Sequence, residues 1–554
     1  MPHMRSIYYS VHEILTLGKG KAENNFPFLR KPVIKPGYVK AGTPALRFSH
    51  NVVHYNQWKM PVDTIRRTEN RFTAEKKGKN MKVSRRLIAG VTGAVMLAAL
   101  CAGCGAKKEP VTITIWNYYN GGQLETFNDM VQTFNDTVGK EQGIAVECES
   151  QGSVNDLEVN VMNAAEGKVG AEELPNIFSG YADTAYALDH LGLVVDLNDY
   201  LTDAEKSAYI KGYLEEGDFD GSGEMKIFPT AKSTEILCLN DTDWQAFAQA
   251  TGAAYDDLAT VEGVTATAEK YYDWTDAQTA APDDGRALFG RDAMANYMLI
   301  GAKELGCTIF DVQDGKMTLH FDKDVIRKLW DNYYVPFVKG YFEATGHFRS
   351  DDIKTGTILG YAGSNSSATF FPTDVLTSDT DSHEITLKVL PNPHFEGSAP
   401  ISVQQGAGMV VTKGDEAEIK ASVTFLKWFT APENNIAFSV GSGYLPVTYE
   451  ANQKEKLLSS GVEMTKAVQD VLSMAIKTVN EDEMYTTRAF AAGKDARKVL
   501  EYAMSDLAVA DRDTVEQRIA AGQSAEQAEA EFLSDAYFDG WYQEILTQLQ
   551  AFEG

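Results

Sequence analysis

Residues 111–150 read VTITIWNYYN GGQLETFNDM VQTFNDTVGK EQGIAVECES, and this stretch decides the fold. Residues 111–116 alternate in polarity and are rich in β-branched side chains, which is typical of a β-strand. Apolar residues then recur at helical spacing over 124–138, and a second strand pattern covers 144–148. A strand, a helix and a second strand in this order predict a βαβ unit and a mainly parallel sheet of the α/β class.

The same alternation continues along the chain. A helix is expected over 156–165 and a third strand from 174 to 178, with later helices at 294–305, 325–334 and 417–429. We also expect a short strand over 225–228 and a mostly helical C-terminal third, with Ser505 and Asp513 at helix starts or in loops. Ligands of such sheets gather at the carboxyl ends of strands, where Tyr118, Tyr119 and Tyr181 would lie.

An export signal is predicted before this region. Three basic residues near Met81 precede an apolar run of roughly 14 residues, which is shorter than the about 20 that a membrane span needs. The run closes on Cys101-Ala-Gly-Cys104, which resembles the bacterial lipobox, although Cys101 replaces the usual Leu. That resemblance implies a signal peptide over 81–103, a diacylglycerol on Cys104 as the mature N-terminus, and a polar tether over 104–110. An uncleaved membrane anchor and a C-x-x-C redox pair are the alternatives.

The segment before Met81 differs in composition from the rest. It carries 15 Lys and Arg against 5 Asp and Glu and shows no sustained apolar periodicity, so it has no basis for a core. We therefore expect Met81 to be the true start and residues 1–80 to be a disordered, non-native upstream extension. The alternative is a natural basic extension in the cytosol.

The formal net charge of the chain is −27, and the exported part is more acidic still because the first 103 residues are basic. Such a surface repels nucleic acid and anionic lipid, so neither is an expected partner, and a monomer held at the membrane by its lipid is expected. The remaining cysteines, Cys148, Cys238 and Cys307, allow at most one disulfide.

Catalytic signatures are missing from the sequence. No H-E-x-x-H, G-x-S-x-G or Walker motif occurs, and the histidines after residue 110 are dispersed without metal-ligand spacing. We therefore expect no enzyme activity, metal or cofactor. A surface-anchored polysaccharide hydrolase stays open as the alternative, since a carboxylate pair is identified only by its separation in space.

A series of motifs over nearly all of residues 111–450 resembles the bacterial extracellular solute-binding proteins of ABC importers, in the family of the maltose and glycerol-phosphate receptors. Their order along the chain is more specific than any one of them. The motifs are Ile113-Thr-Ile-Trp116, Leu174-Pro-Asn-Ile-Phe178, Val195-Asp-Leu-Asn-Asp-Tyr200, Glu224-Met-Lys-Ile-Phe-Pro229 with Ile236-Leu-Cys-Leu-Asn240, Gly360-Tyr-Ala-Gly363, Gly406-Ala-Gly-Met-Val-Val-Thr412 and Gly441-Ser-Gly-Tyr444-Leu-Pro446.

The resemblance implies a two-lobed periplasmic-binding-protein fold with a ligand cleft between lobes joined by crossing strands. We expect lobe 1 to contain residues 111–233 and 396–441, and lobe 2 to contain residues 234–395 and 442–554. A non-enzymatic receptor of this kind captures a solute, here a sugar or oligosaccharide, and delivers it to ABC permease subunits. Sugars pack on aromatic rings and hydrogen-bond to amides and carboxylates. The candidate cleft residues are Tyr118, Tyr119, Asn120, Gln123, Tyr181, Asp183, Tyr361, Asn365, Tyr444, Tyr485 and Arg488.

The charge of the solute is predicted from the cations near these segments. A phosphate-bearing ligand needs a concentrated Lys and Arg site, and Arg488 and Lys232 are the obvious cations near the candidate segments. The sequence therefore favours a neutral sugar.

Overall fold

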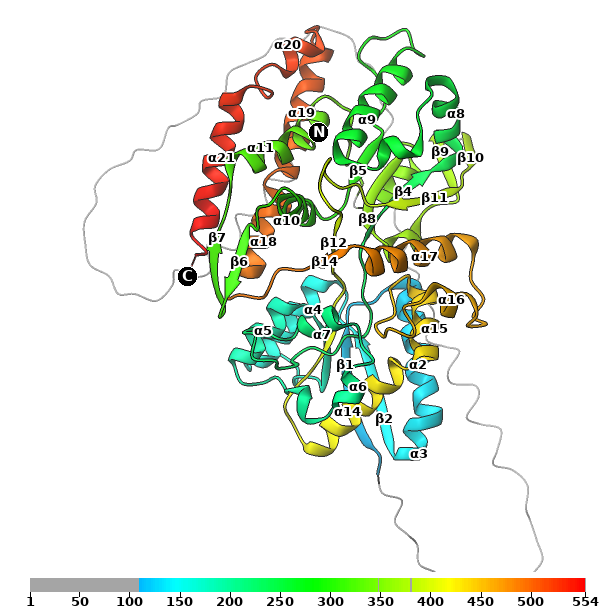
Figure 1. Ribbon diagram of the computed structural model, residues 1–554, viewed down its shortest axis with the longest axis vertical. Helices are drawn as coiled ribbons and strands as arrows, with labels where there is room; N and C mark the ends of the chain where they lie inside the picture. Colours follow the sequence, from blue (N-terminus) through cyan, green and yellow to red (C-terminus); the bar gives the residue numbers. More distant parts are fainter. Residues whose placement is uncertain (1–108, 347, 379–380, 554) are drawn as a thin grey trace, which may run out of the picture. The chain divides into compact units, whose positions relative to one another are not determined.

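The structure is a computed structural model that describes residues 109–346, 348–378 and 381–553. The predicted upstream extension, signal peptide and lipidated Cys104 lie outside these residues. Two four-stranded sheets organise the described chain (Figure 1).

The first sheet has the strand order β13-β3-β1-β2. Strand β1 (Val111–Asn117) lies parallel to β2 (Ile144–Ser150) over its whole length and parallel to β3 (Ile177–Gly180) near its end. Strand β13 (Gly408–Val411) arrives from far along the chain and pairs antiparallel with β3. The prediction of a mainly parallel sheet is confirmed here, with β13 as the antiparallel edge.

Helices α2 (Gly121–Phe134) and α14 (Glu416–Phe429) pack on this sheet. The rings of Phe127 and Phe134 meet that of Phe425 edge-on, with centroids 6.4 and 5.2 Å apart. Each fully buried Phe contributes roughly 1.5–3 kcal/mol relative to an exposed one, so these contacts hold α2 and α14 to the sheet. Trp116 is buried in the same core.

The second sheet has the order β11-β4-β8-β5 and is mixed. Strand β4 (Glu235–Asn240) is antiparallel to both β11 (Leu387–Pro391) and β8 (Gly360–Ser364), whereas β5 (Phe289–Arg291) is parallel to β8. All six residues of β4 are buried, which is typical of a central strand covered on both faces.

The chain crosses between the two sheets at segments that lie side by side. Ser233 pairs with Gln405, and Lys232 pairs with Leu445, as isolated antiparallel bridges. Nearby, β12 (Ile401–Val403) pairs in parallel with β14 (Glu483–Tyr485). Strand β14 leads into α18 (Gly493–Tyr502), which packs against α10 (Met294–Glu304). The lobe boundaries given above stay a prediction.

Several local expectations differ from the structure. Residues 225–228 form a single bridge in place of a strand, in which Phe228 pairs with Met409 of β13. Ser505 begins α19 (Ser505–Ala520), and Asp513 lies within that helix. The expected helix over 325–334 is divided into α11 (Lys323–Asp331) and α12 (Tyr334–Val338). The helix predicted over 124–138 begins earlier and ends in a π-helical turn, η2 (Asn135–Gly139).

The remaining elements cover the outer faces and the connections (Figure 1). They are α3 (Lys140–Gln142), α4 (Val154–Ala165), α5 (Ala182–His190), η3 (Leu197–Asp199), α6 (Asp203–Lys206), α7 (Lys211–Glu215), α8 (Asp241–Thr251), η4 (Tyr255–Leu258), α9 (Val261–Asp276), β6 (Phe310–Gln313), β7 (Lys316–Leu319), α13 (Arg349–Lys354), η5 (Ser367–Phe370), β9 (Asp374–Ser378), β10 (Asp381–Glu384), α15 (Pro432–Ser442), α16 (Lys454–Leu458), α17 (Lys466–Glu481), α20 (Ala525–Glu529) and α21 (Asp535–Gln550).

Two further observations concern the described residues. Cys148, Cys238 and Cys307 are all free, so the one disulfide that the sequence allowed is not formed among them. Among the described helices, none combines the length and apolar character that a membrane crossing requires.

Candidate functional site

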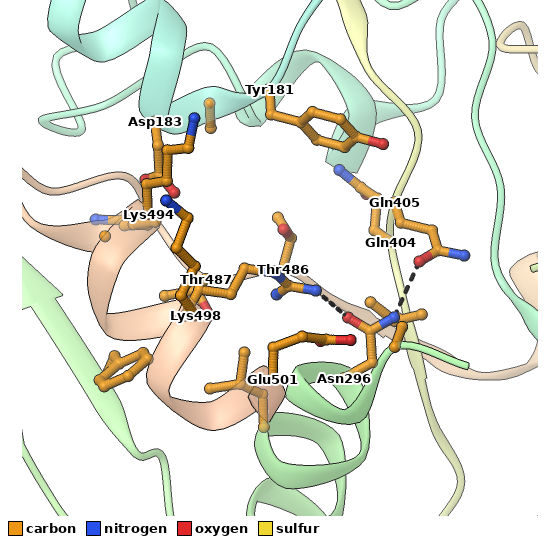
Figure 2. Close-up of a pocket in the computed structure, with 18 of the residues that line it drawn as sticks. Tyr181, Asp183, Asn296, Gln404, Gln405, Thr486, Thr487, Lys494, Lys498 and Glu501 are labelled. Carbon is orange, nitrogen blue, oxygen red and sulfur yellow. Dashed lines mark hydrogen bonds between the residues drawn. The ribbon is translucent and has the colours of Figure 1, made fainter. Parts of the chain in front are cut away.

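A cavity of about 420 Å³ lies between the part of the chain that holds the first sheet and the helices α10 and α18. One wall comes from α4 and from the β3–α5 turn, which carries Tyr181 and Asp183 at the carboxyl end of a parallel strand. The other wall comes from α10 and α18, and the crossing segment supplies Gln404 and Gln405 (Figure 2). The cavity volume is within the range of small-molecule pockets, so the arrangement can enclose a solute between the two halves of the chain.

The floor of the cavity rests on a fully buried ion pair. Lys232 has no exposed surface, and its ammonium contacts the Glu216 carboxylate and donates to the carbonyl of Gly406 at 2.7 Å. Gln404, which faces the cavity, donates to Gly212 O at 3.1 Å and more weakly to Glu216 at 3.4 Å. The buried charge and the cavity wall therefore share one hydrogen-bond network.

A second network centres on Asn296 at the start of α10. Its amide donates to Glu235 at 2.7 Å and to the side-chain oxygen of Gln405 at 2.9 Å, and its own oxygen accepts from Arg497. Arg291 approaches Glu235 at 3.2 Å, and both side chains are buried. Burial raises the pKa of Glu235, and the Arg291 charge opposes that rise. The network fixes the orientation of Gln405 and Arg497 at the cavity (Figure 2).

One face of α18 forms much of the second wall. Arg497 and Lys498 lie three and four residues after Lys494, so both neighbour it on one face of the helix, and all three line the cavity. Lys494 forms an ion pair with Glu158 of α4, and this pair connects the two walls. Glu501, one turn further on, accepts the backbone N–H groups of Met294 and Ala295.

Glu501 caps the start of α10, where the local sequence offers no capping side chain. The residue before that helix, Ala293, has no side chain that could cap it and adopts a left-handed conformation with φ of 47°. The first N–H groups of a helix need acceptors and favour a negative charge. The Glu501 carboxylate supplies both, and it thereby ties α18 to α10.

Asp183 approaches the N-terminus of α18 closely. A Cβ atom on Gly493 would lie 2.4 Å from the Asp183 carboxylate, so a larger residue here would force the Asp183 side chain to move. Burial raises the pKa of Asp183 to about 6, and the nearby Arg497 guanidinium opposes the rise.

Four of the predicted site residues line the cavity, namely Tyr181, Asp183, Tyr485 and Arg488. The Lys303 ammonium lies over the Tyr485 ring, 4.7 Å from the ring centroid, in a cation–π contact. Contact between these residues and a solute stays a prediction.

The other predicted residues lie outside the wall of this cavity. Tyr118, Tyr119 and Tyr444 are buried together, with the hydroxyls of Tyr118 and Tyr444 3.4 Å apart, and Tyr118 stacks on Tyr181 at 6.4 Å. Burial raises the pKa values of all four tyrosines, so they remain neutral hydroxyls.

Polar candidates beyond the cavity make structural contacts. Gln123 donates to Ser442 O at 3.1 Å, and Asn365 binds the Thr234 backbone N–H at 2.7 Å and the Gly443 carbonyl. Tyr361 is fully buried in β8, and Asn120 is exposed before α2. Asn365 therefore joins two of the crossing segments.

Sequence reasoning missed the cations of α18 and the amides Gln404, Gln405 and Asn296. The three-four spacing of Lys494, Arg497 and Lys498 could have identified a cationic face, but the same spacing is typical of a solvated helix. Among the described residues, no group of three or more His, Cys, Asp or Glu side chains has an arrangement that could hold a metal ion.

Comparisons with known proteins support one family. A family model for bacterial extracellular solute-binding protein matches residues 129–468. A comparison with curated protein sequences finds no match.

Solved structures share the fold. The cyclic α-maltosyl-1,6-maltose binding protein from Arthrobacter globiformis is 15% identical, with a TM-score of 0.56 over 80% of this chain and 100% of that one. UgpB from Mycobacterium tuberculosis in complex with glycerophosphocholine is 17% identical, with a TM-score of 0.58 over 80% and 98%. An ABC substrate-binding protein from Listeria monocytogenes in complex with cycloalternan is 15% identical, with a TM-score of 0.56 over 80% and 99%.

Proposed function

The chain belongs to the bacterial extracellular solute-binding proteins and has their two-lobed periplasmic-binding-protein fold; from this premise we propose that it binds a carbohydrate-like solute in the cavity and delivers it to an ABC permease. One observation carries the proposal. The cavity of about 420 Å³ lies at the crossing of the two lobes and combines tyrosine rings with side-chain amides.

The chemistry of the wall suits a polyhydroxylated ring. Tyr181 and Tyr485 offer aromatic surface to the C–H faces of a sugar. Gln404, Gln405 and Asn155 offer amide groups that both donate and accept, as sugar hydroxyls require. Two proteins of the same fold also support a sugar ligand. One is a cyclic α-maltosyl-1,6-maltose binding protein, and the other was solved in complex with cycloalternan.

Enclosure of the solute would come from approach of the two lobes. Closure around a ligand by hinge motion is a known movement of periplasmic binding proteins. Here the crossing segments that carry Lys232, Ser233 and Gln405 form the connection, and the Glu158–Lys494 pair joins the walls on the far side of the cavity. We propose that the liganded form with this pair made is the one that docks on the permease.

Attachment to the membrane would come from Cys104. Family membership places the protein outside the cytoplasm, and a lipid on Cys104 would hold it next to its permease. Two acyl chains give stable anchoring where a single chain is marginal. A Cys104→Ser variant should be released from the membrane fraction, whereas retention of that variant at wild-type levels would contradict the lipid anchor.

A thermal-shift screen over sugars tests the binding function. A ligand at a hundredfold excess over its Kd stabilises the native state by about 2.7 kcal/mol, which is a measurable shift. Isothermal titration should then give one site per chain, with no change in the sugar when the mixture is analysed by chromatography. Cleavage of an oligosaccharide, or a shift with peptides and none with sugars, would refute the proposal.

A further inference from the structure

The charges around the cavity differ from those of the whole protein. The chain has 78 Asp and Glu against 51 Lys and Arg. The cavity nevertheless collects four cationic side chains from a single stretch, namely Arg488, Lys494, Arg497 and Lys498. All four lie on the wall formed by the β14–α18 segment.

Two of the four acidic residues that line the cavity are compensated by ion pairs. Glu216 is paired with the buried Lys232 beneath the floor. Glu501 accepts the two N–H groups at the start of α10, which orient its carboxylate but leave its negative charge in place. Glu158 is paired with Lys494, which removes one acid and one cation together.

Three cations, Arg488, Arg497 and Lys498, therefore remain against two carboxylates, Asp183 and Glu501. Among the described residues, neither Arg488 nor Arg497 has a carboxylate within ion-pair distance, and Lys498 has a loose, exposed pair with Asp495 at 3.7 Å. Arg497 is held by the neutral Asn296, which orients its guanidinium without cancelling its charge. An oriented guanidinium next to a second and a third cation is suited to a planar or tetrahedral anion.

We propose that the solute carries an anionic group, a carboxylate, phosphate or sulfate, that binds to Arg497, Lys498 and Arg488 while its sugar part contacts Tyr181 and the amides. This inference rests on the proposed function, and it reverses the neutral sugar that the sequence favoured. Lys232, one of the two cations considered in the sequence analysis, is paired with Glu216, whereas Arg497 and Lys498 of α18 join Arg488 at the cavity.

Matched ligands test the charge of the solute directly. The probes are trigalacturonic acid against its full methyl ester, and glucose 6-phosphate against glucose, with affinities measured by titration calorimetry. The ester keeps the shape of the acid and removes its charge. The acidic member of at least one pair should bind at least tenfold more tightly, and that advantage should shrink between 50 mM and 500 mM salt. The pair that shows the advantage distinguishes a carboxylate from a phosphate.

Two substitutions locate the anion. Arg488→Gln and Lys498→Gln remove exposed cations without disturbing the buried networks, and each should lower the ratio of acidic-probe to neutral-probe affinity roughly tenfold or more. Lys477→Gln, an exposed lysine of α17 paired with Glu481, is the matched control and should change neither affinity.

The outcomes separate this inference from the function on which it depends. Equal binding of the acidic and neutral members, or an acidic preference that survives both substitutions, overturns the inference and leaves sugar binding in place. Absence of binding by every member of both pairs and by the neutral sugars of the thermal-shift screen overturns the proposed function and this inference with it.

Discussion

Replacement of the buried Lys232 by methionine should destabilise the protein strongly. Methionine matches the length of the lysine stem but leaves the Glu216 carboxylate, whose side chain is 7% exposed, without its charge partner. It also removes the hydrogen bond to the Gly406 carbonyl. Breaking a buried pair by removing one partner costs about 3–5 kcal/mol, which is a large part of the about 5–15 kcal/mol that holds a typical domain.

Urea unfolding followed by tryptophan fluorescence measures this loss. The midpoint should fall with an unchanged slope, since the surface exposed on unfolding stays the same. A Lys232→Met, Glu216→Leu double variant should recover most of the loss, because an apolar pair of similar volume avoids the desolvation cost. Lys211→Met is the control: that lysine is exposed and pairs with Glu215 on the surface, so little change is expected. A loss below about 1 kcal/mol for Lys232→Met, or a double variant as unstable as the single one, would refute this account of the pair.

Three further results are expected. Lys494→Gln should widen the distance between fluorophores placed on the two lobes in the absence of solute, because it breaks the Glu158 pair across the cavity; an unchanged distance would contradict a role in closure. Asp183→Asn should raise the melting temperature at pH 8 and have no effect near pH 4. The folded-state pKa of about 6 lies above the unfolded value, so the ionised carboxylate destabilises the fold increasingly as pH rises through about 4 to 6. A rise in melting temperature that is larger at pH 4 than at pH 8 would contradict this pH dependence. Gly493→Ala should lower the melting temperature and weaken solute binding, since its Cβ would collide with the Asp183 carboxylate, whereas Gly540→Ala, in open space on α21, should not; similar behaviour of the two variants would contradict the close approach.

The first sheet could be predicted from the sequence because its signals are local. The alternation in β1 and the helical spacing after it follow from side chains within one strand and one helix, and the structure confirms both. The second sheet is harder to predict, because β4, β8 and β11 come from distant parts of the chain and pair antiparallel. Nothing within β4 indicates which strands will lie beside it.

The site could be predicted only in part, for the same reason. Tyr181 follows directly from the rule that ligands gather at strand ends. Tyr118 and Tyr119 satisfy the same rule but turn into the core, where they pack against Tyr444. The direction of a side chain after a strand depends on which distant segments cover it, and in this protein those segments lie more than 300 residues away.

The role of α18 was beyond local reasoning. Its cations resemble an ordinary solvated face, and they line a cavity because Glu501 attaches this helix to the start of α10. The contact between Glu501 and the start of α10 spans about 200 positions in the chain, and no pattern within either helix predicts it.

The crossing segment that carries Gln404 and Gln405 has a consequence for redesign. The same residues face the cavity, hydrogen-bond to the buried pair below it, and belong to the connection between the lobes. An attempt to alter the ligand preference through these glutamines would also shift the balance between open and closed forms. Engineers who convert this protein into a fluorescent sensor should therefore retarget it through the β14–α18 wall and leave the crossing segment as it is.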